Sequence, residues 1–246
     1  MKRIIIMGAS SGIGLELAEM LASRGVRVGL AARHTERLHA LKGKYPEVVE
    51  YMSIDITHRD APAKLNELID KTGGMDIYVH VSGILRDNAD LNPQTEAEVV
   101  NTNASGFARM LSAAYGYFRD NGRAGQIVAV SSVAGTKGIG RLAAYSASKA
   151  FDTGYMVALE QLANSENVDV KLTEILPGWV RTPLLDSDSR YPMEMDAEYV
   201  AYRILKAIVE RRRRAVIDWR WRMLRSLWRL LPERLWVRMD VALTDD

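Results

Sequence analysis

Cysteine is absent from this chain of 246 residues, and proline is scarce, with only seven residues. Without cysteine the protein has no disulfide, no thiolate nucleophile and no thiolate ligand for a metal ion. We expect no metal site. The few prolines form no proline-rich linker between domains. The lack of disulfides suits a reducing compartment, so we expect a cytoplasmic protein.

Long apolar runs are also absent. The run at residues 4–7 follows two basic residues, but it is too short for the hydrophobic region of a signal peptide. No uncharged apolar window is long enough to span a bilayer. Hydrophobic residues nonetheless make up 48% of the chain, enough for a sizeable core, and the length suits one large α/β domain as well as two small ones.

Acidic residues are scarce in one stretch close to, but not at, the C-terminus. Residues 211–238 contain ten arginines against Asp218 and Glu233, a net charge of +8. The whole chain has a net charge of +2, so the remainder carries −6. This contrast divides the chain into a main domain, residues 1–218, and a basic, tryptophan-rich extension, residues 219–246.

Short apolar runs alternate with helical patterns throughout the main domain. The runs predict strands at residues 2–7, 26–32, 47–54, 75–82, 126–131, 168–176 and 215–218. The helical patterns predict helices at residues 15–23, 60–71, 95–121, 145–162 and 196–210. This alternation is typical of an α/β protein with a doubly wound parallel sheet.

A glycine-rich turn joins the first strand to the first helix. The residues of this turn that we expect to bind a ligand are Gly8, Ser10, Ser11, Gly12, Ile13 and Gly14. Backbone N–H groups and the positive end of a helix dipole make such a turn a phosphate site. The spacing Gly-x-x-x-Gly-x-Gly differs from the common dinucleotide fingerprint, and a turn without a ligand is the alternative. The flanking strand and helix favour the phosphate site, and with it a single-domain, Rossmann-type fold that carries an amphipathic C-terminal extension.

The second strand is followed by Arg33, at the place where a dinucleotide-binding protein selects its cofactor. An acidic residue at this place binds the ribose 2′-OH of NAD, whereas an arginine accommodates the 2′-phosphate of NADP. Arg33 therefore favours NADP, and a solvated loop arginine is the alternative.

A hydroxyl, a phenol and an ammonium follow the fifth strand. Ser132 comes first, Tyr145 lies thirteen residues later, and Lys149 four residues after that. On a helix, Tyr145 and Lys149 share a face. A phenol ordinarily has a pKa of roughly 10, and an ammonium beside it stabilises the phenolate. Such a tyrosine can exchange a proton with a substrate, and open α/β sheets bind their ligands at the carboxyl ends of the strands.

Together these motifs resemble the short-chain dehydrogenase/reductase family over residues 1–218. The glycine turn is similar to the family's Thr-Gly-x-x-x-Gly-x-Gly, with Met7 in place of the threonine. The resemblance implies four catalytic residues, which are Asn103, Ser132, Tyr145 and Lys149. It also implies further cofactor contacts at Asp55, Ile56, Ser82, Gly83, Tyr145, Lys149, Pro177, Gly178, Val180 and Thr182.

The resemblance implies a role for each catalytic residue as well. Tyr145 is the general acid in carbonyl reduction and the base in alcohol oxidation. Lys149 binds the nicotinamide ribose and stabilises the Tyr145 phenolate. Ser132 donates a hydrogen bond to the substrate oxygen as its charge develops, and Asn103 holds a water that connects Lys149 to solvent. The cofactor supplies the hydride.

One segment departs from the family pattern. Residues 80–83 are His-Val-Ser-Gly, where the family has Asn-Asn-Ala-Gly to brace the central sheet. We expect His80 to be packed in the core and not to be catalytic.

Residues 183–195 lie where the resemblance places a lid over the substrate. Lids order on binding and shield hydride transfer from water. Two roles are open for the apolar side chains of this segment, because they either line a substrate pocket or pack the lid down. These side chains are Leu184, Leu185, Tyr191, Met193 and Met195.

The C-terminal extension predicts an amphipathic helix at residues 219–231. Its apolar side holds Trp221, Leu224, Trp228 and Leu231, extended by Met223, Leu227 and Leu230. The opposite side holds Arg222, Arg225 and Arg229. This pattern fits peripheral contact of residues 219–239 with the inner face of a membrane, where the arginines at 211–214 would attract anionic lipid. It fits equally a helix packed on the domain or between subunits, whereas nucleic acid is not expected as a partner because no recognised motif accompanies the charge.

The main hypothesis is an NADP(H)-dependent oxidoreductase that interconverts a ketone and a secondary alcohol. The extension favours a lipophilic substrate, such as a ketosphingoid base of the 3-ketosphinganine type, a steroid or another lipid ketone, by analogy within the family. One alternative is a reductase of a small soluble carbonyl compound, with the extension serving the packing of a homodimer or homotetramer. The other is a non-catalytic NADP-binding scaffold, which is disfavoured because all four catalytic positions hold the expected residues.

Overall fold

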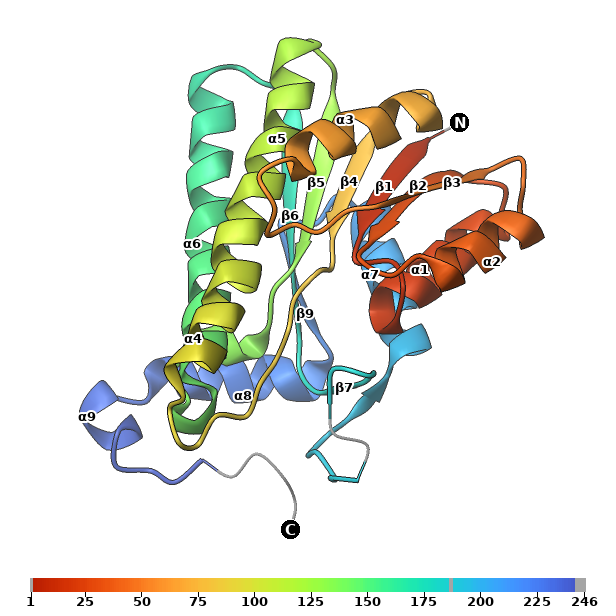
Figure 1. Cartoon of the computed structure of the whole chain (residues 1–246). Helices are drawn as coiled ribbons and strands as arrows, with labels where there is room; N and C mark the ends of the chain where they lie inside the picture. Colours follow the sequence, from red (N-terminus) through yellow and green to blue (C-terminus); the bar gives the residue numbers. More distant parts are fainter. Residues whose placement is uncertain (1, 186–187, 242–246) are drawn as a thin grey trace.

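The computed structural model describes residues 2–185 and 188–241, and these form a parallel sheet of seven strands at the centre of the molecule (Figure 1). In order across the sheet the strands are β3 (Val49–Ser53), β2 (Arg27–Ala32), β1 (Arg3–Met7), β4 (Ile77–His80), β5 (Gly125–Val130), β6 (Val170–Pro177) and β9 (Arg214–Ile217). The strand order reverses direction between β1 and β4. The doubly wound sheet expected from the sequence is confirmed, and such sheets bind ligands beside the carboxyl ends at this reversal.

Strand β1 shows why these segments form the centre of the sheet. Its apolar residues 4–7 are all 3% exposed or less, because helices cover both faces of a parallel sheet. Residues of β1 pair with β2 on one side and with β4 on the other, so Met7 lies between Ala31 and His80. The carboxyl ends of β1, β2 and β4 are therefore held side by side.

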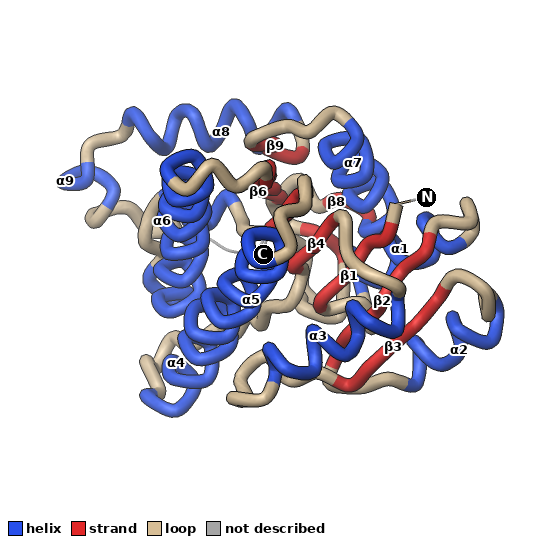
Figure 2. Tube along the Cα trace, turned by 90° about the horizontal axis from the view of Figure 1, so that it is seen from above, coloured by secondary structure: helices blue, strands red, loops and turns tan. Residues whose placement is uncertain are grey.

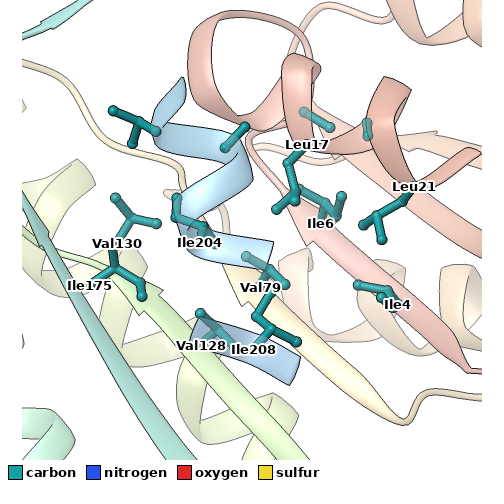
Figure 3. Packing of buried hydrophobic residues seen from close by; sticks show 14 of the residues in the cluster. Ile4, Ile6, Leu17, Leu21, Val79, Val128, Val130, Ile175, Ile204 and Ile208 are labelled. Carbon is teal, nitrogen blue, oxygen red and sulfur yellow. The ribbon is translucent and has the colours of Figure 1, made fainter. Parts of the chain in front are cut away.

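Helices cover the two faces of the sheet in two layers (Figure 2). One layer consists of α1 (Gly12–Ala22), α2 (Glu36–Lys44) and α7 (Ala197–Val209). The other layer consists of α3 (Ala61–Thr72), α5 (Phe107–Asp120) and α6 (Ala143–Ser165). Figure 3 shows the core under the first layer, where Leu17 of α1 and Ile204 of α7 join one apolar cluster with Ile6, Val128 and Ile175 of the strands.

The long helix expected at residues 95–121 is interrupted. It consists of α4 (Pro93–Val100), a π-helical turn, η1 (Asn101–Gly106), and α5. The Asn92 side chain caps α4 by accepting hydrogen bonds from the N–H groups of Gln94 and Thr95, at 3.0 and 3.2 Å. Turns of the π type are rare and are found frequently at functional sites, and this one contains Asn103.

Several short elements were not predicted from the sequence. They are α2, the 3₁₀ turns η2 (Val133–Thr136) and η3 (Gly140–Leu142), the paired strands β7 (Val180–Arg181) and β8 (Met195–Asp196), and α9 (Glu233–Trp236). Most are too short for a hydrophobic period to emerge, and α2 buries only Leu38 and Leu41. The pair of β7 and β8 is parallel and holds together the two ends of the expected lid segment.

The C-terminal extension packs on the domain through α8 (Trp219–Leu230), which lies beyond the carboxyl end of β9 (Figure 1). Asp218 caps this helix by accepting a hydrogen bond from the Arg220 N–H at 3.0 Å. Trp221 is only 3% exposed, and its ring lies so close to Gly178 that a Cβ added there would be 1.9 Å from the indole. Among the described residues, no helix combines the length and the apolar character needed to cross a membrane.

The side of α8 that was expected to face lipid is the side that packs on the domain. The residues of that side, all buried or partly buried, are Trp221, Leu224, Trp228 and Leu231. The residues expected to extend it are instead exposed, and these are Met223, Leu227 and Leu230. Arg225 was expected on the opposite side but is partly buried, and burial lowers the pKa of its guanidinium. The helix has two apolar stripes, and only its packing shows which of them is covered.

The arginines at 211–214 do not belong to the surface of α8. Arg213 and Arg214 form ion pairs with Glu160 and Glu174, each at 2.6 Å. Arg213 precedes β9 and Arg214 is its first residue, whereas α8 begins after the last residue of this strand. The charges of Arg213 and Arg214 are therefore compensated by carboxylates of the domain, and the attraction of residues 211–214 to anionic lipid stays a prediction.

His80 is packed in the core at the end of β4, as expected. It is completely buried, its Nδ1 lies 3.0 Å from the Tyr78 hydroxyl, and its ring lies edge-on to Phe107 with ring centres 5.1 Å apart. Burial, reinforced by the charge of Lys149, lowers the pKa of His80 to about 3. The imidazole is therefore neutral at physiological pH.

Replacing Trp221 by alanine should lower the free energy of unfolding by about 3–5 kcal/mol, the usual cost of truncating a large buried aromatic side chain. The matched variant Trp219→Ala removes a tryptophan of the same helix that is 64% exposed. It should change stability by no more than about 0.5 kcal/mol. Denaturant titrations of the two variants measure the difference, and equal effects would show that α8 does not dock through Trp221.

The low pKa of His80 predicts that acid destabilises the fold. The unfolded chain takes up a proton on this histidine near its ordinary pKa of 6.5, whereas the folded chain does so only at about 3. The free energy of unfolding therefore falls as the pH drops below that ordinary value, by about 2 kcal/mol between pH 7 and pH 5.

His80→Asn should abolish this contribution. When the pH is lowered from 7 to 5, the free energy of unfolding of wild type should therefore fall by about 2 kcal/mol more than that of the variant. Denaturant titrations at the two pH values measure this change. His34→Asn, at an exposed histidine, should keep the wild-type pH dependence. An unaltered pH dependence in His80→Asn would contradict a buried, neutral histidine.

Candidate active site

Two adjoining cavities lie at the carboxyl ends of the strands. The first, of about 280 Å³, is mainly apolar and contains Ser132, Tyr145 and Lys149, and we call it the apolar cavity. The second, of about 300 Å³, lies over the glycine turn and is more polar, and we call it the polar cavity. Ile13 and Thr182 line both of them. The two cavities therefore meet beside the start of α1.

The expected hydroxyl, phenol and ammonium meet in the apolar cavity. Ser132 lies between β5 and η2, and its Oγ accepts a hydrogen bond from the Ala134 N–H at 3.1 Å. Tyr145 and Lys149 lie on successive turns of α6, with Lys149 Nζ at 5.8 Å from the centre of the Tyr145 ring. All three residues are less than 9% exposed. A substrate oxygen that reached them would be largely shielded from water.

A buried carboxylate holds the Lys149 ammonium. Nζ donates hydrogen bonds to Asp152 Oδ2 at 3.0 Å and to the Val130 carbonyl at 3.4 Å. Burial alone lowers the pKa of Lys149, but Asp152 and Tyr145 raise it above its ordinary value. Burial raises the pKa of Asp152 to about 6, although Lys149 acts in the opposite direction. Lys149 is therefore protonated at neutral pH, and Asp152 is a residue of the site that the sequence analysis missed.

Asn103 lies behind this group. Its Nδ2 donates to the Ile84 carbonyl at 2.8 Å and to Ser148 Oγ at 3.3 Å, and its Oδ1 accepts from the Ile84 N–H at 2.8 Å. A Cβ added at Gly83 would be 3.4 Å from Asn103 Oδ1 and 3.7 Å from Lys149 Nζ. The π-helical turn thus places Asn103 close to Lys149, where it ties the segment after β4 to α6.

The polar cavity collects most of the expected cofactor-binding residues. Its expected lining residues are Gly8, Ser10, Ser11, Gly12, Ile13, Arg33, Asp55, Ile56, Ser82, Gly83 and Thr182. The Ser11 side chain does not cap α1, so backbone N–H groups at this helix end are available to an anion. Burial by itself raises the pKa of Asp55, but hydrogen bonds from Thr57 lower it below its ordinary value. This carboxylate is therefore ionised.

The remaining expected residues divide between the apolar cavity and the protein interior. Those in the apolar cavity are Ser132, Tyr145, Lys149, Pro177, Gly178 and Val180. Gly14 and Asn103 line neither cavity. A Cβ at Gly14 would be 2.0 Å from the Gly8 carbonyl oxygen, so this glycine lets α1 start against the turn.

Three tryptophans and a leucine form a wall of the apolar cavity that the sequence analysis did not assign to the site. The wall includes Trp179, Trp221, Leu224 and Trp228. Three of these four residues come from α8. The amphipathic pattern identified the three residues of α8 as part of an apolar side. The spacing of apolar residues along one helix does not show, however, which cavity that side covers.

The expected lid segment contributes to the same cavity. Its lining residues are Leu184, Leu185, Pro192 and Met193. Tyr191 lies against Trp179, with ring centres 4.8 Å apart, and Met195 is buried in the core beside α7. Residues 186–187 of this segment lie outside the described residues.

Hydrogen bonds join the C-terminal extension to two segments of the main domain beside the cavity. Trp221 Nε1 donates to the Met193 carbonyl at 3.2 Å, and Trp236 Nε1 donates to the Gly138 carbonyl at 2.6 Å. The first bond joins α8 to the lid segment, and the second joins α9 to the segment between η2 and η3. The extension is therefore part of the site and not a separate tail.

The relatives with sequences similar to this chain include three proteins from different organisms. An uncharacterized oxidoreductase of Myxococcus xanthus is 36% identical over 195 residues, which cover 77% of this chain and 76% of the relative. An uncharacterized oxidoreductase of Mycobacterium tuberculosis is 32% identical over 246 residues, 95% of each chain. A farnesol dehydrogenase of Aedes aegypti is 32% identical over 194 residues, 75% of this chain and 79% of the relative.

Solved structures show the same fold. A 3-ketoacyl-(acyl-carrier-protein) reductase from Brucella melitensis, complexed with NADH, superposes with a TM-score of 0.79 at 23% identity, over 88% of this chain and 96% of that one. A variant of actinorhodin polyketide ketoreductase with NADPH superposes with a TM-score of 0.72 at 25% identity, over 84% and 90%. The family model described as short chain dehydrogenase matches residues 2–191. The chain therefore belongs to the short-chain dehydrogenase/reductase family and is an oxidoreductase that acts on CH–OH groups.

Proposed function

We propose that the protein is an NADP(H)-dependent oxidoreductase that interconverts a lipophilic ketone and its secondary alcohol. The observation that carries this proposal is a single cavity in which Ser132, Tyr145 and Lys149 lie together while aromatic and aliphatic side chains form much of the remaining wall. Such a cavity gives the oxygen of an otherwise apolar substrate its hydrogen-bonding partners at one place, and a few convergent polar groups are what orient a ligand in an apolar site.

The polar cavity fits the phosphates and the adenosine of NADPH. Gly8 and Gly12 have φ angles of +94° and +50°, which glycine adopts without strain, and the start of α1 offers backbone N–H groups to a pyrophosphate. The residues that would hold the cofactor are the expected lining residues of the polar cavity, together with Tyr145, Lys149, Pro177, Gly178 and Val180. When bound, NADPH supplies the hydride.

The side chains of the apolar cavity stabilise charge, transfer the proton and hold each other in place. Ser132 Oγ donates a hydrogen bond to the substrate oxygen and stabilises its developing negative charge. The Tyr145 hydroxyl gives its proton to that oxygen in reduction and takes it back in oxidation. Lys149 stabilises the phenolate, and Asp152 keeps Lys149 charged and in place. Asn103 holds the segment after β4 against α6.

Arg33 supports NADPH as the cofactor. It lines the polar cavity directly after β2, where an acidic residue would favour the ribose 2′-OH of NADH and an arginine favours a 2′-phosphate. The two solved structures described above hold NADH in one case and NADPH in the other. We therefore expect Arg33 to decide whether this chain prefers NADPH or NADH.

The apolar wall supports a lipophilic substrate. Trp179, Trp221 and Trp228 present large apolar surfaces to the cavity. One relative is named a farnesol dehydrogenase, and we propose that the substrate here is a lipid alcohol or ketone, a class that includes ketosphingoid bases and steroids. A small soluble carbonyl compound would leave most of this apolar surface unused.

Tyr145→Phe should keep NADPH binding and lower turnover about 10²–10⁴-fold, because it removes the proton donor and leaves the ring. Tyr155→Phe removes a hydroxyl from the same helix that donates to the Ala108 carbonyl, outside the cavity, and should keep turnover. NADPH oxidation with a panel of lipid and small ketones, beside NADPH titrations, measures both quantities. Turnover of Tyr145→Phe within twofold of wild type would remove Tyr145 from the mechanism.

Arg33→Asp should weaken NADPH binding strongly and NADH binding little, because a hydrogen bond to a charged group contributes about 1.5–3 kcal/mol. Arg37→Asp makes the same change at an exposed arginine of α2 that lines neither cavity, and should affect both cofactors little. Fluorescence titrations of each variant with the two cofactors give the four dissociation constants. An equal loss for NADPH and NADH in Arg33→Asp would mean that Arg33 does not select the cofactor.

A further inference from the structure

The outer side of α8 is apolar and is not covered by the described residues. Four residues at helical spacing form an outer stripe on this side, which are Trp219, Met223, Leu227 and Leu230, at 64%, 58%, 61% and 80% exposure. A surface helix ordinarily presents polar residues on the side that faces away from the core. Helix α8 is therefore apolar on two sides. Only its inner side is buried, because that side packs on the domain.

The outer stripe is followed by further exposed apolar residues. Leu235, Val237 and Met239 are 52%, 71% and 53% exposed. Large apolar side chains exposed on successive turns of one helix, as in the outer stripe, form the kind of apolar patch that marks interaction sites. The end of the chain that carries α8 and α9 therefore presents a surface suited to an apolar partner.

Arginines border the outer stripe. Arg222 and Arg229 lie on the adjacent side of α8, and Arg234 and Arg238 follow it, all of them exposed. None of these four forms an ion pair with a carboxylate among the described residues. Residues 219–241 contain six arginines against two acidic residues. The apolar stripe thus has a positively charged border.

We propose that the outer stripe docks on the surface of an anionic lipid bilayer. Its apolar side chains would enter the boundary between headgroups and acyl chains, while the bordering arginines contact anionic headgroups. A second copy of the chain is the weaker occupant of this surface. Two outer stripes placed face to face would bring their arginines together with few carboxylates to compensate them.

Docking in this way places the active site beside the bilayer. The inner side of α8 lines the apolar cavity through Trp221, Leu224 and Trp228, so a single helix separates the cavity from the docking surface. A lipophilic substrate dissolved in the bilayer would reach the cavity with little passage through water. This consequence for the substrate rests on the proposed function, whereas the docking itself does not.

Co-sedimentation with vesicles tests the docking without an enzymatic readout. The full chain should bind vesicles of phosphatidylcholine and phosphatidylglycerol at least about tenfold more strongly than vesicles of phosphatidylcholine alone, since several arginines contribute. High salt should weaken this binding, because charges are screened over about 3 Å at 1 M and about 8 Å at physiological ionic strength.

Two substitutions in the outer stripe should remove the binding. Trp219→Glu and Leu227→Glu should each lower it at least about tenfold, because each replaces a large apolar side chain by a charge. Both residues are exposed, so the melting temperature and NADPH binding should not change. Val209→Glu is the matched control, at an apolar residue of α7 that is 74% exposed and lies at the other end of β9 from α8, and it should bind vesicles as wild type does.

Three results would overturn the proposal. The first is equal binding of wild type to the two kinds of vesicle, and the second is an equal loss of binding in Val209→Glu. The third is a wild-type dimer in sedimentation velocity that Leu227→Glu converts to a monomer, without vesicle binding, which would make the outer stripe a contact between copies. NADPH oxidation with the panel of lipid and small ketones, measured without vesicles, tests the proposed function separately, because a protein without activity can still dock.

Discussion

The contact between Trp221 and Gly178 connects the C-terminal extension to the active site. Gly178 directly follows β6, and a Cβ there would be 1.9 Å from the Trp221 indole. The same indole donates a hydrogen bond to the Met193 carbonyl and forms part of the wall of the apolar cavity. This contact of Trp221 with Gly178 therefore fixes the position of α8. The hydrogen bond of α8 to the lid segment and the shape of the cavity depend on the same tryptophan.

The fold and the proposed catalytic group could be predicted because their signals are local. Buried strands appear as short apolar runs, and the turn at residues 8–14 lies between one such run and a helical pattern. Tyr145 and Lys149 share a face of α6 because four residues separate them, whatever the rest of the chain does. The order of these motifs along the chain then placed them at one edge of the sheet, where the structure has them.

The parts that could not be predicted depend on contacts between distant segments. Helix α8 has two apolar stripes, so the spacing of its apolar residues identifies a helix but leaves open which stripe faces the domain. That choice is made by the fit of Trp221 against Gly178, which no local pattern reports. Asp152 is an intermediate case. Its distance of three residues from Lys149 is visible in the sequence, but its complete burial, which gives the pair its importance, is not.

Among the described residues, Lys149 is the only lysine or arginine that is buried. Asp152 supplies the compensating charge at 3.0 Å, and His80 stays neutral because burial and the charge of Lys149 lower its pKa to about 3. A protonated His80 would add a second buried cation without a carboxylate of its own, which is strongly unfavourable. Glu174, the other buried carboxylate near this group, is paired with Arg214. Lys149 therefore presents an ammonium to the Tyr145 side of the cavity, which is the electrostatic condition that proton transfer from a phenol requires.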